Sequence, residues 1–260
     1  MMSGLRLALR EVPYENRSFW RNPAAAFFTF AFPILFLVIL TTILGDYAIT
    51  LPTGQEADNS TYYTASILSF SVITACYTNI AMQVTFARDE GVLKRVRGTP
   101  LPGWSFLLGK VLHAVVIMAI LVVIVCAFGL VFYDLDLPTR SLPAFLVTLA
   151  VGSASFCALG LAVTAVIPNA EAAPAIVNAS ILPLLFISGV FIPIDATPQW
   201  LQTLADIFPV KHFLEASIES FVPPPDNRAG WALSELAIVA AWGVAGMILA
   251  ARFFSWEPRR

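Results

Sequence analysis

The sequence predicts an all-α, polytopic membrane protein with six transmembrane helices, and three observations lead to this fold class. Hydrophobic residues make up 58% of the chain and charged residues only 12%, about half the charged fraction of a soluble domain. Apolar runs of about 20 residues, the length that crosses a bilayer as a helix, recur along the whole chain. Proline, glycine or charged residues separate most of these runs, and a soluble fold could not cover so much apolar surface.

The six predicted spans are 24–45, 62–87, 105–132, 143–167, 173–192 and 231–254. The fifth span is short and carries Pro183 in its middle, which frees a backbone carbonyl that neighbouring helices can satisfy. Small residues recur at every fourth position in the fourth and sixth spans, a spacing typical of close-packed helix faces. These residues are Ala154, Ala158, Ala162, Ala237, Ala241 and Ala245.

Basic residues lie almost entirely on one side of the predicted membrane. Twelve of the 15 Lys and Arg residues fall before the first span, in or near the loop between the second and third spans, or near the end of the sixth span and after it. Because basic loops stay in the cytosol, both termini and the 88–104 loop are predicted to be cytosolic. An even number of spans requires the two termini to share a side, so the two inferences agree.

The segments on the opposite side of the predicted membrane are acidic. We interpret them as a solvated outer surface, with a vestibule that attracts cations as the alternative. The acidic residues concerned are Asp46, Glu56, Asp58, Asp134, Asp136, Asp195, Asp206, Glu215, Glu219 and Asp226.

Residues 1–23 are predicted to form an amphipathic helix that lies in the membrane interface. Four arginines share one helical face, and apolar residues such as Leu9 and Trp20 lie opposite them. A segment of this kind directs its bases toward lipid headgroups and its aromatic residues toward the acyl chains. Pro13 is expected to kink the helix or divide it in two. The segment serves either as a simple membrane anchor or also as a contact for a cytosolic partner.

The most charged stretch, RDEGVLKRVRGTPLP at 88–102, lies in the predicted cytosolic loop between the second and third spans. Asp89 and Glu90 suit the N-terminus of a helix, and the bases after them suit its C-terminus, because of the helix dipole. Gly98 and the prolines that follow are stop signals. We therefore expect a cytosolic helix of about two turns. A helix this short is marginal in water, so either a docking partner or the chain's own bundle must hold it.

This stretch resembles the cytosolic loop of type-2 ABC transporter permeases, the membrane subunits of many bacterial exporters. Val92 stands where the family commonly has threonine, and Gly98 where it commonly has alanine. The residues that match the family element are Arg88, Asp89 or Glu90, Gly91, Leu93, Arg95, Thr99, Pro100, Leu101 and Pro102. The resemblance implies that the 88–104 loop carries a coupling helix, which docks on a separate ATPase subunit. The residues that it assigns to this coupling surface are Arg88, Asp89, Glu90, Gly91, Leu93, Lys94, Arg95 and Arg97.

A second stretch, 169–213, is similar to the same family in the order of its elements. A polar turn precedes an apolar helix, and Ser-Gly, Phe and Pro, then a Pro-x-Trp-Leu element and a late proline follow. The matching residues are Ser188, Gly189, Phe191, Pro193, Pro198, Trp200, Leu201 and Pro209, whereas Phe208 stands where asparagine is usual. The resemblance implies one permease domain over 1–260, in which short re-entrant helices at 193–230 cap the outer side.

The resemblance also implies a function, namely the transmembrane subunit of an ATP-driven exporter in a bacterial cytoplasmic membrane. Its cargo would be drug-like, lipid or glycolipid molecules, and antibiotic-efflux permeases are the most similar group. The implied partners are ABC ATPase subunits, a second permease that is the same or a homologous chain, and membrane lipids, but no nucleic acid. The chain is not expected to be an enzyme or to bind a cofactor, because ATP and Mg²⁺ would be held by the ATPase. The alternatives are a secondary carrier or channel that needs no ATPase and, less favoured, a membrane-embedded enzyme.

Polar residues inside the predicted spans are the default candidates for a transport path. They are Thr74, Asn79, Gln83, Asn178 and Ser188. None of them is ionisable, whereas an ion-coupled carrier usually needs a buried charge, so the pattern favours energy supplied from outside the membrane. The candidates for an outer gate, after the fifth span, are Phe191, Ile192 and Pro193.

Two signals for other chemistry are weak. The stretch GWSFLLGKV at 103–111 is not a P-loop, because its glycine spacing is wrong and it leads into a membrane span. His113 and His212 lie far apart in the sequence, so no metal site is predicted.

Overall fold

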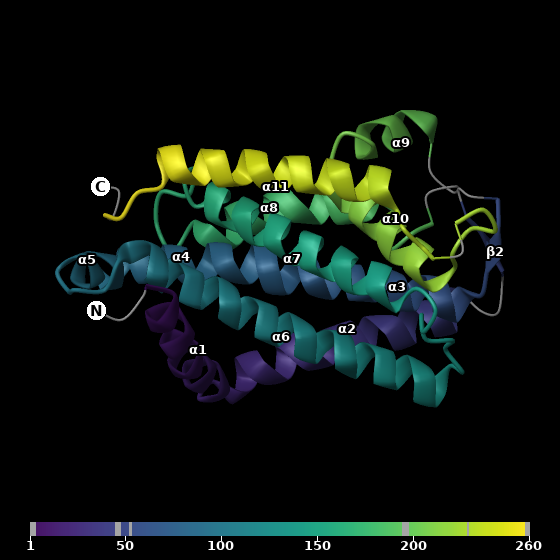
Figure 1. Cartoon of the computed structure of the whole chain (residues 1–260), viewed down its shortest axis with the longest axis horizontal. Coiled ribbons are helices and arrows are strands. Elements are labelled where there is room, and N and C mark those ends of the chain that lie inside the picture. Colours follow the sequence, from purple (N-terminus) through teal and green to yellow (C-terminus); the bar gives the residue numbers. More distant parts are fainter. Residues whose placement is uncertain (1–3, 45–47, 52–53, 194–197, 228, 258–260) are drawn as a thin grey trace.

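The computed structural model describes residues 4–44, 48–51, 54–193, 198–227 and 229–257 as an elongated helical bundle. α5 lies at one end, near the two ends of the described chain, and a small hairpin lies at the other (Figure 1). Its helices include α1 (Gly4–Trp20), α2 (Pro23–Leu44), α3 (Asn59–Ile73), α4 (Asn79–Asp89), α6 (Gly103–Phe132), α7 (Leu142–Val163) and α11 (Leu233–Phe253). The other elements are β1 (Ile49–Thr50), β2 (Glu56–Ala57), the π-helix η1 (Thr74–Thr78), α5 (Val92–Arg97), α8 (Ala173–Ile187), α9 (Gln199–Ala205) and α10 (Pro209–Phe221).

Five of the described helices are long and apolar enough to cross a membrane. They are α2, the continuous helix formed by α3, η1 and α4, then α6, α7 and α11, and they agree with five of the predicted spans. α8 is apolar but has only 15 residues, about 22 Å of helix against a hydrocarbon core of about 30 Å. The fifth predicted span, 173–192, and with it the count of six, therefore stays a prediction.

Two local features differ from the sequence prediction. A two-stranded antiparallel hairpin, in which Ile49 faces Ala57 and Thr50 faces Glu56, interrupts the otherwise all-helical fold. α1 runs through Pro13 as one helix, so the expected division there is wrong. The reason is that α1 packs against α6 on both sides of the proline, through Glu11 before it and Phe19 after it, and this packing keeps the helix continuous.

The long helix Asn59–Asp89 forms the centre of the bundle. Thirteen of the 15 residues of α3 are buried, and α2, α6, α7 and α10 surround this helix. Some of its buried hydroxyls are satisfied by its own backbone, since Ser69 donates to the carbonyl of Ala65 and Ser71 to that of Ile67. A hydroxyl that bonds to its own helix in this way needs no water inside the membrane. Others, among them those of Ser66 and Thr85, are buried without a hydrogen-bond partner among the described residues.

α11 packs against α7 through glycines rather than through the predicted alanines. A Cβ on Gly243 would lie 2.4 Å from the Oγ of Ser155, and one on Gly246 would lie 3.0 Å from a backbone nitrogen of α7. The predicted face of the sixth span is therefore wrong, because its three alanines are exposed; they are Ala237, Ala241 and Ala245. On α7, Ala158 is buried as predicted, whereas Ala154 is exposed. Glycine lies at this helix–helix contact because it allows the closest approach of two backbones.

Gly243→Val should lower the free energy of unfolding by about 1–3 kcal/mol, because the new side chain must displace Ser155 or the α7 backbone. Ala241→Val is the matched control, since it adds the same volume to α11 at an exposed position and should change stability little. Thermal unfolding of the purified protein in lipid nanodiscs measures both. Equal midpoints for Gly243→Val and the wild type would contradict the packing described here.

Candidate coupling surface and transport path

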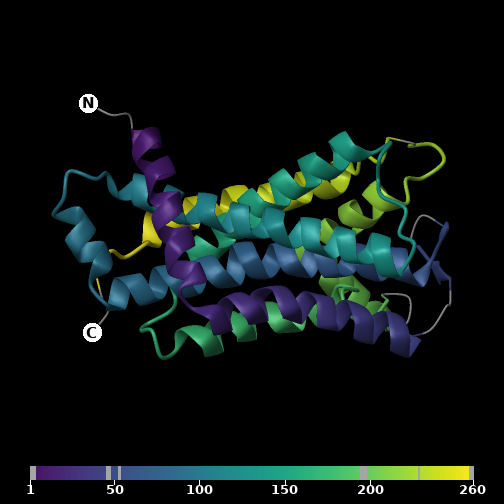
Figure 2. The same cartoon turned by 90° about the horizontal axis from the view of Figure 1, so that it is seen from below.

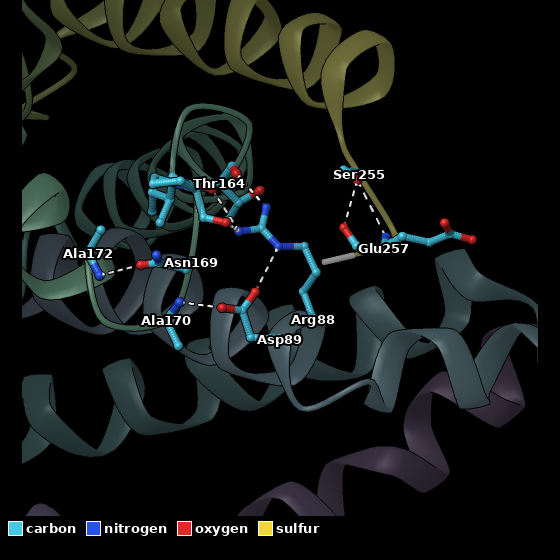
Figure 3. Close-up of polar contacts among 10 residues, drawn as sticks. Arg88, Asp89, Thr164, Asn169, Ala170, Ala172, Ser255 and Glu257 are labelled. Atoms are coloured by element: carbon cyan, nitrogen blue, oxygen red, sulfur yellow. Dashed lines mark hydrogen bonds and ion pairs between the residues drawn. The ribbon is translucent and has the colours of Figure 1, made fainter. Parts of the chain in front are cut away.

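Arg88 is buried at the end of α4, where only 1% of its surface is exposed. Its guanidinium donates hydrogen bonds to the backbone carbonyls of Thr164 (3.0 Å) and Ile167 (2.7 Å), with a longer contact to that of Pro168. These carbonyls follow the C-terminal end of α7, where backbone oxygens have no partner within the helix. Figure 3 shows the planar fork pointing into this α7–α8 turn. Arginine suits the site because its donors diverge in a fixed geometry.

Asp89 joins the same turn from the other side. One carboxylate oxygen accepts a hydrogen bond from the backbone N–H of Ala170, and the other lies 3.5 Å from the Nε of Arg88 (Figure 3). Asn169 accepts a hydrogen bond from the N–H of Ala172 just before α8. Arg88 and Asp89 therefore tie the end of α4 to the α7–α8 loop, and the buried Arg88 has an opposite charge beside it. We call this arrangement of Arg88, Asp89 and the α7–α8 turn the arginine clamp.

The junction between α4 and α5 differs from the prediction. Asp89 is the last residue of α4 and Glu90 is its C-cap, so neither forms the N-terminus of the next helix and that assignment is wrong. The chain turns at Gly91, whose φ is +71°, and α5 begins directly after it. Glycine tolerates this left-handed conformation because it has no Cβ. The predicted stop at Gly98 is confirmed, since α5 ends at Arg97.

α5 has a buried apolar side and an exposed basic side. Leu93 is fully buried in the main core, and Val92 and Val96 pack partly against it. The apolar stripe of α5 is thus held by the chain's own bundle, which was one of the two predicted alternatives. The predicted coupling residues that remain exposed are Glu90, Lys94, Arg95 and Arg97. The surface that α5 offers to a partner is therefore mainly basic, and it lies at the extremity of the molecule (Figure 1).

α1 crosses the bundle near its α5 end (Figure 2). Its side chains form three different faces. One face packs on α6, where the Nζ of Lys110 lies 2.8 Å from the Oε1 of Glu15 and Phe19 contacts the ring of His113. The other two faces are exposed, one apolar and one basic. Their residues are Leu5, Leu9 and Trp20 on the apolar face, and Arg6, Arg10 and Arg17 on the basic face. α1 is a helix with the apolar and basic faces expected for residues 1–23, of which 1–3 lie outside the described residues. Its place in the membrane interface stays a prediction.

The segment after α11 returns to the same end of the molecule and packs on the loop. A Cβ on Gly103 would lie 2.4 Å from the indole of Trp256. The Nη1 of Arg97 and the Oε1 of Glu257 lie 3.8 Å apart, and both side chains are more than half exposed. An exposed ion pair contributes at most about 1 kcal/mol, so the packing of Trp256 is the main contact here.

Three of the five predicted path residues lie together around the π-helix η1. Thr74 and Asn79 line a cavity of about 350 Å³ between this helix and α2, and Gln83 donates a 3.0 Å hydrogen bond to Asn79. The other two lie elsewhere, because Asn178 is exposed on α8 and Ser188 is buried at the end of α8. A π-helix inside an α-helix often marks a functional site, so the residues around η1 are the stronger candidates.

Tyr77, on the same π turn, is a candidate that the sequence analysis missed. Its hydroxyl lies 2.6 Å from the Oγ of Ser180 on α8, and both residues line a second cavity of about 310 Å³ with Phe208 and Trp242. One turn of η1 therefore borders two apolar cavities on different sides. No sequence signal could have found this, because a tyrosine in an apolar run is ordinary and a single π turn leaves no periodicity.

The predicted outer gate divides into a buried and an exposed part. Phe191 is buried, and its ring centroid lies 5.0–5.6 Å from three other rings, which are those of Phe36, Phe70 and Phe186. Gly189 makes the turn before it with a φ of +91°, and its carbonyl accepts a 2.7 Å hydrogen bond from Tyr62. Ile192 is exposed and Pro193 partly exposed. Phe191 alone of the three therefore closes an aromatic cluster between α2, α3 and α8.

Comparison with known proteins decides what kind of chain this is. The model of the family described as "ABC-2 type transporter" matches residues 12–222, which is most of the chain. The chain belongs to the ABC-2 type transporter family. It is therefore a permease, the kind of chain that forms the membrane part of an ABC transporter.

Individual relatives of this ABC-2 permease are distant. It is 25% identical over 162 residues to YbhR of Escherichia coli K12, which is named a probable multidrug ABC transporter permease. That match covers 62% of this chain but only 44% of YbhR, so the chain spans less than half of that relative. The chain is also 24% identical to ycf38 of Pyropia yezoensis (86% of this chain, 75% of ycf38) and 23% identical to YvfS of Bacillus subtilis (76% and 79%). The names of both proteins describe them as transport permeases.

Arg88→Lys should lower the stability of the permease by about 3 kcal/mol, the usual cost of breaking a buried charged contact. A lysine ammonium is a single point and cannot reach the carbonyls of Thr164 and Ile167 and the carboxylate of Asp89 together. Arg95→Lys makes the same change at an exposed position and is the control. Thermal midpoints in nanodiscs test this, and equal midpoints for Arg88→Lys and Arg95→Lys would show that the arginine clamp does not stabilise the fold.

Proposed function

We propose that this permease is the membrane subunit of an ATP-driven exporter, energised by separate ABC ATPase subunits that dock on α5. The observation that carries the proposal is the exposed basic side of α5, whose apolar side is fixed to the bundle. Lys94, Arg95 and Arg97 offer three positive charges to a partner, and an acidic groove on the ATPase would complement them. Helix and partner then meet at a surface that is already rigid, which lowers the entropy cost of docking.

Displacement of α5 by a partner would reach the membrane through two contacts. Through Leu93, a displacement of α5 would move the core beneath this helix. Through the arginine clamp, it would move the turn that joins α7 to α8. Packed elements transmit small shifts because they deform little. α8 is in turn linked to η1 through Ser180 and Tyr77. A series of specific side-chain contacts therefore connects the proposed docking site on α5 to both cavities.

The cargo that fits this proposal is a drug-like, lipid or glycolipid molecule. Both cavities beside η1 are mainly apolar and carry a few polar groups, among them Asn79 and Ser180, which suits an amphipathic molecule. The name of YbhR, a probable multidrug ABC transporter permease, supports a drug-like cargo. α2 exposes large aromatic residues, including Phe28 and Phe32, on a face that a second permease would cover. That second permease is the same or a homologous chain.

The proposed setting is a bacterial cytoplasmic membrane, with α5 and both termini in the cytosol. The basic residues of α1 and α5 lie toward one end of the bundle, and the hairpin and α9 lie toward the other (Figure 1). Export would then run from the α5 end toward the hairpin end. Charged residues of the five spanning helices stay within about two turns of a helix end, so an ion path through their middle, as in a secondary carrier, gains no support.

Arg95→Glu should weaken docking of the ATPase by about tenfold or more, because like charges across an interface cost several kcal/mol. Arg95→Lys keeps the charge and serves as the control. Both variants are reconstituted with the cognate ATPase, and cargo transport and cargo-stimulated ATP hydrolysis are measured. Full coupled activity of Arg95→Glu would exclude a coupling role for this residue. Gradient-driven flux by the purified permease alone would instead favour a secondary carrier.

Phe191→Ala should raise uncoupled ATP hydrolysis or cargo leak in the reconstituted transporter, because it opens the aromatic cluster at the proposed gate. Phe191→Leu keeps more of the apolar volume and should leak less. Ile192→Ala is the control, since Ile192 is exposed in the single chain. If leak is unchanged in Phe191→Ala, or rises equally in Ile192→Ala, Phe191 is not the gate.

A further inference from the structure

A compact group of ionisable side chains lies between α10 and α11, away from the arginine clamp and outside both cavities. His212 and Glu215 lie one turn apart on α10, and Glu235 lies in the first turn of α11. One possible ligand atom from each residue lies within 4.8 Å of the other two. Their side chains are 9%, 23% and 20% exposed, so the group is largely shielded from solvent.

The imidazole of His212 is held in one orientation. Its Nε2 lies 2.8 Å from the backbone carbonyl oxygen of Asp206. A carbonyl only accepts hydrogen bonds, so Nε2 carries the hydrogen and donates. Nδ1 then faces the carboxylate of Glu235. Histidines that bind metals are oriented in this way, with one nitrogen donating to a carbonyl and the other directed at the ion.

Negative charge exceeds positive charge around this imidazole. Lys211 contacts Asp206 closely, whereas its Nζ is 3.6 Å from the Oε1 of Glu215, longer than an ordinary hydrogen bond of about 3 Å. Burial raises the pKa of Glu215; the charge of Lys211 lowers it, and the charge of Glu235 raises it further. Lys211 is therefore shared by Asp206 and Glu215, whereas Glu235 contacts His212.

We propose that His212, Glu215 and Glu235 bind a divalent transition-metal ion, for which Zn²⁺ is the best match. One imidazole nitrogen and two carboxylates supply three ligands, which leaves a fourth position for water. Mg²⁺ and Ca²⁺ prefer sites made of oxygen alone. The ion would join α10 to α11 and fix the short helix against the last membrane span. The sequence predicts no metal site because its two histidines are distant, whereas the fold brings carboxylates from two helices to one of them.

Without a metal, the contact between His212 and Glu235 would be an ion pair in which the histidine is protonated. A metal-binding experiment distinguishes this ion pair from the proposed metal site. The full-length chain is purified in detergent, stripped with a chelator and dialysed against Zn²⁺, and bound metal is measured by elemental analysis. The wild type should bind one Zn²⁺ per chain, and its thermal midpoint should rise with Zn²⁺ because the ion binds only the folded state. Glu235→Gln and Glu215→Gln keep the side-chain shape and should each weaken binding by at least about tenfold.

Glu219→Gln is the matched control, because it removes a carboxylate one turn further along α10 without removing a proposed ligand. It should keep most of the affinity. Co²⁺ gives a second readout, since ligation by His212 would produce visible d–d absorption that His212→Ala abolishes. The site is overturned if the wild type binds no stoichiometric Zn²⁺, or if Glu219→Gln weakens binding as much as Glu235→Gln does. None of these binding measurements requires transport, so the proposed function as a transporter subunit does not depend on their outcome.

Discussion

The burial of Arg88 is the constraint on which the whole α5 end of the molecule depends. A guanidinium inside a protein must find acceptors at fixed positions, because an unpaired buried charge is very costly. The carbonyls that follow α7 lack partners within their helix and need donors. Each group therefore satisfies the other, with Thr164 and Ile167 as the acceptors. Two loops that are distant in sequence become one unit, and α5 is anchored to it.

Several polar groups deeper in the bundle also find their hydrogen-bond partners within the chain. Ser69 and Ser71 bond their own helix, and Tyr77 bonds Ser180 on α8. The result is a set of helices that are linked by specific contacts and surrounded by apolar surfaces. Movement of such a bundle is confined to shifts of whole helices, and η1 is the place where the helix geometry already departs from the ideal. This combination suits a transporter whose energy enters at one end.

The sequence was sufficient for those features that depend on length and composition. The third span, predicted at 105–132, agrees closely with Gly103–Phe132 because a proline precedes that helix and its apolar run is unbroken. Contacts between distant segments could not be predicted. In the sequence, Arg88 is one of several basic residues in the same segment. Its burial depends on the α7–α8 turn, which begins at Thr164, 76 residues later. Likewise, a four-residue spacing cannot decide whether Gly243 or Ala241 faces α7, since that depends on the approach of the partner helix.

The central claim is that α5 is the docking surface for an ATPase, and site-specific cross-linking in native membranes tests it most directly. A photoreactive amino acid replaces Lys94, which is exposed on α5, and in a second strain it replaces Val131, which is 70% exposed near the far end of α6. Position 94 should yield a covalent product with a chain that carries a P-loop, and position 131 should yield none. The claim is contradicted if position 94 captures no such ATPase while the purified permease transports cargo alone.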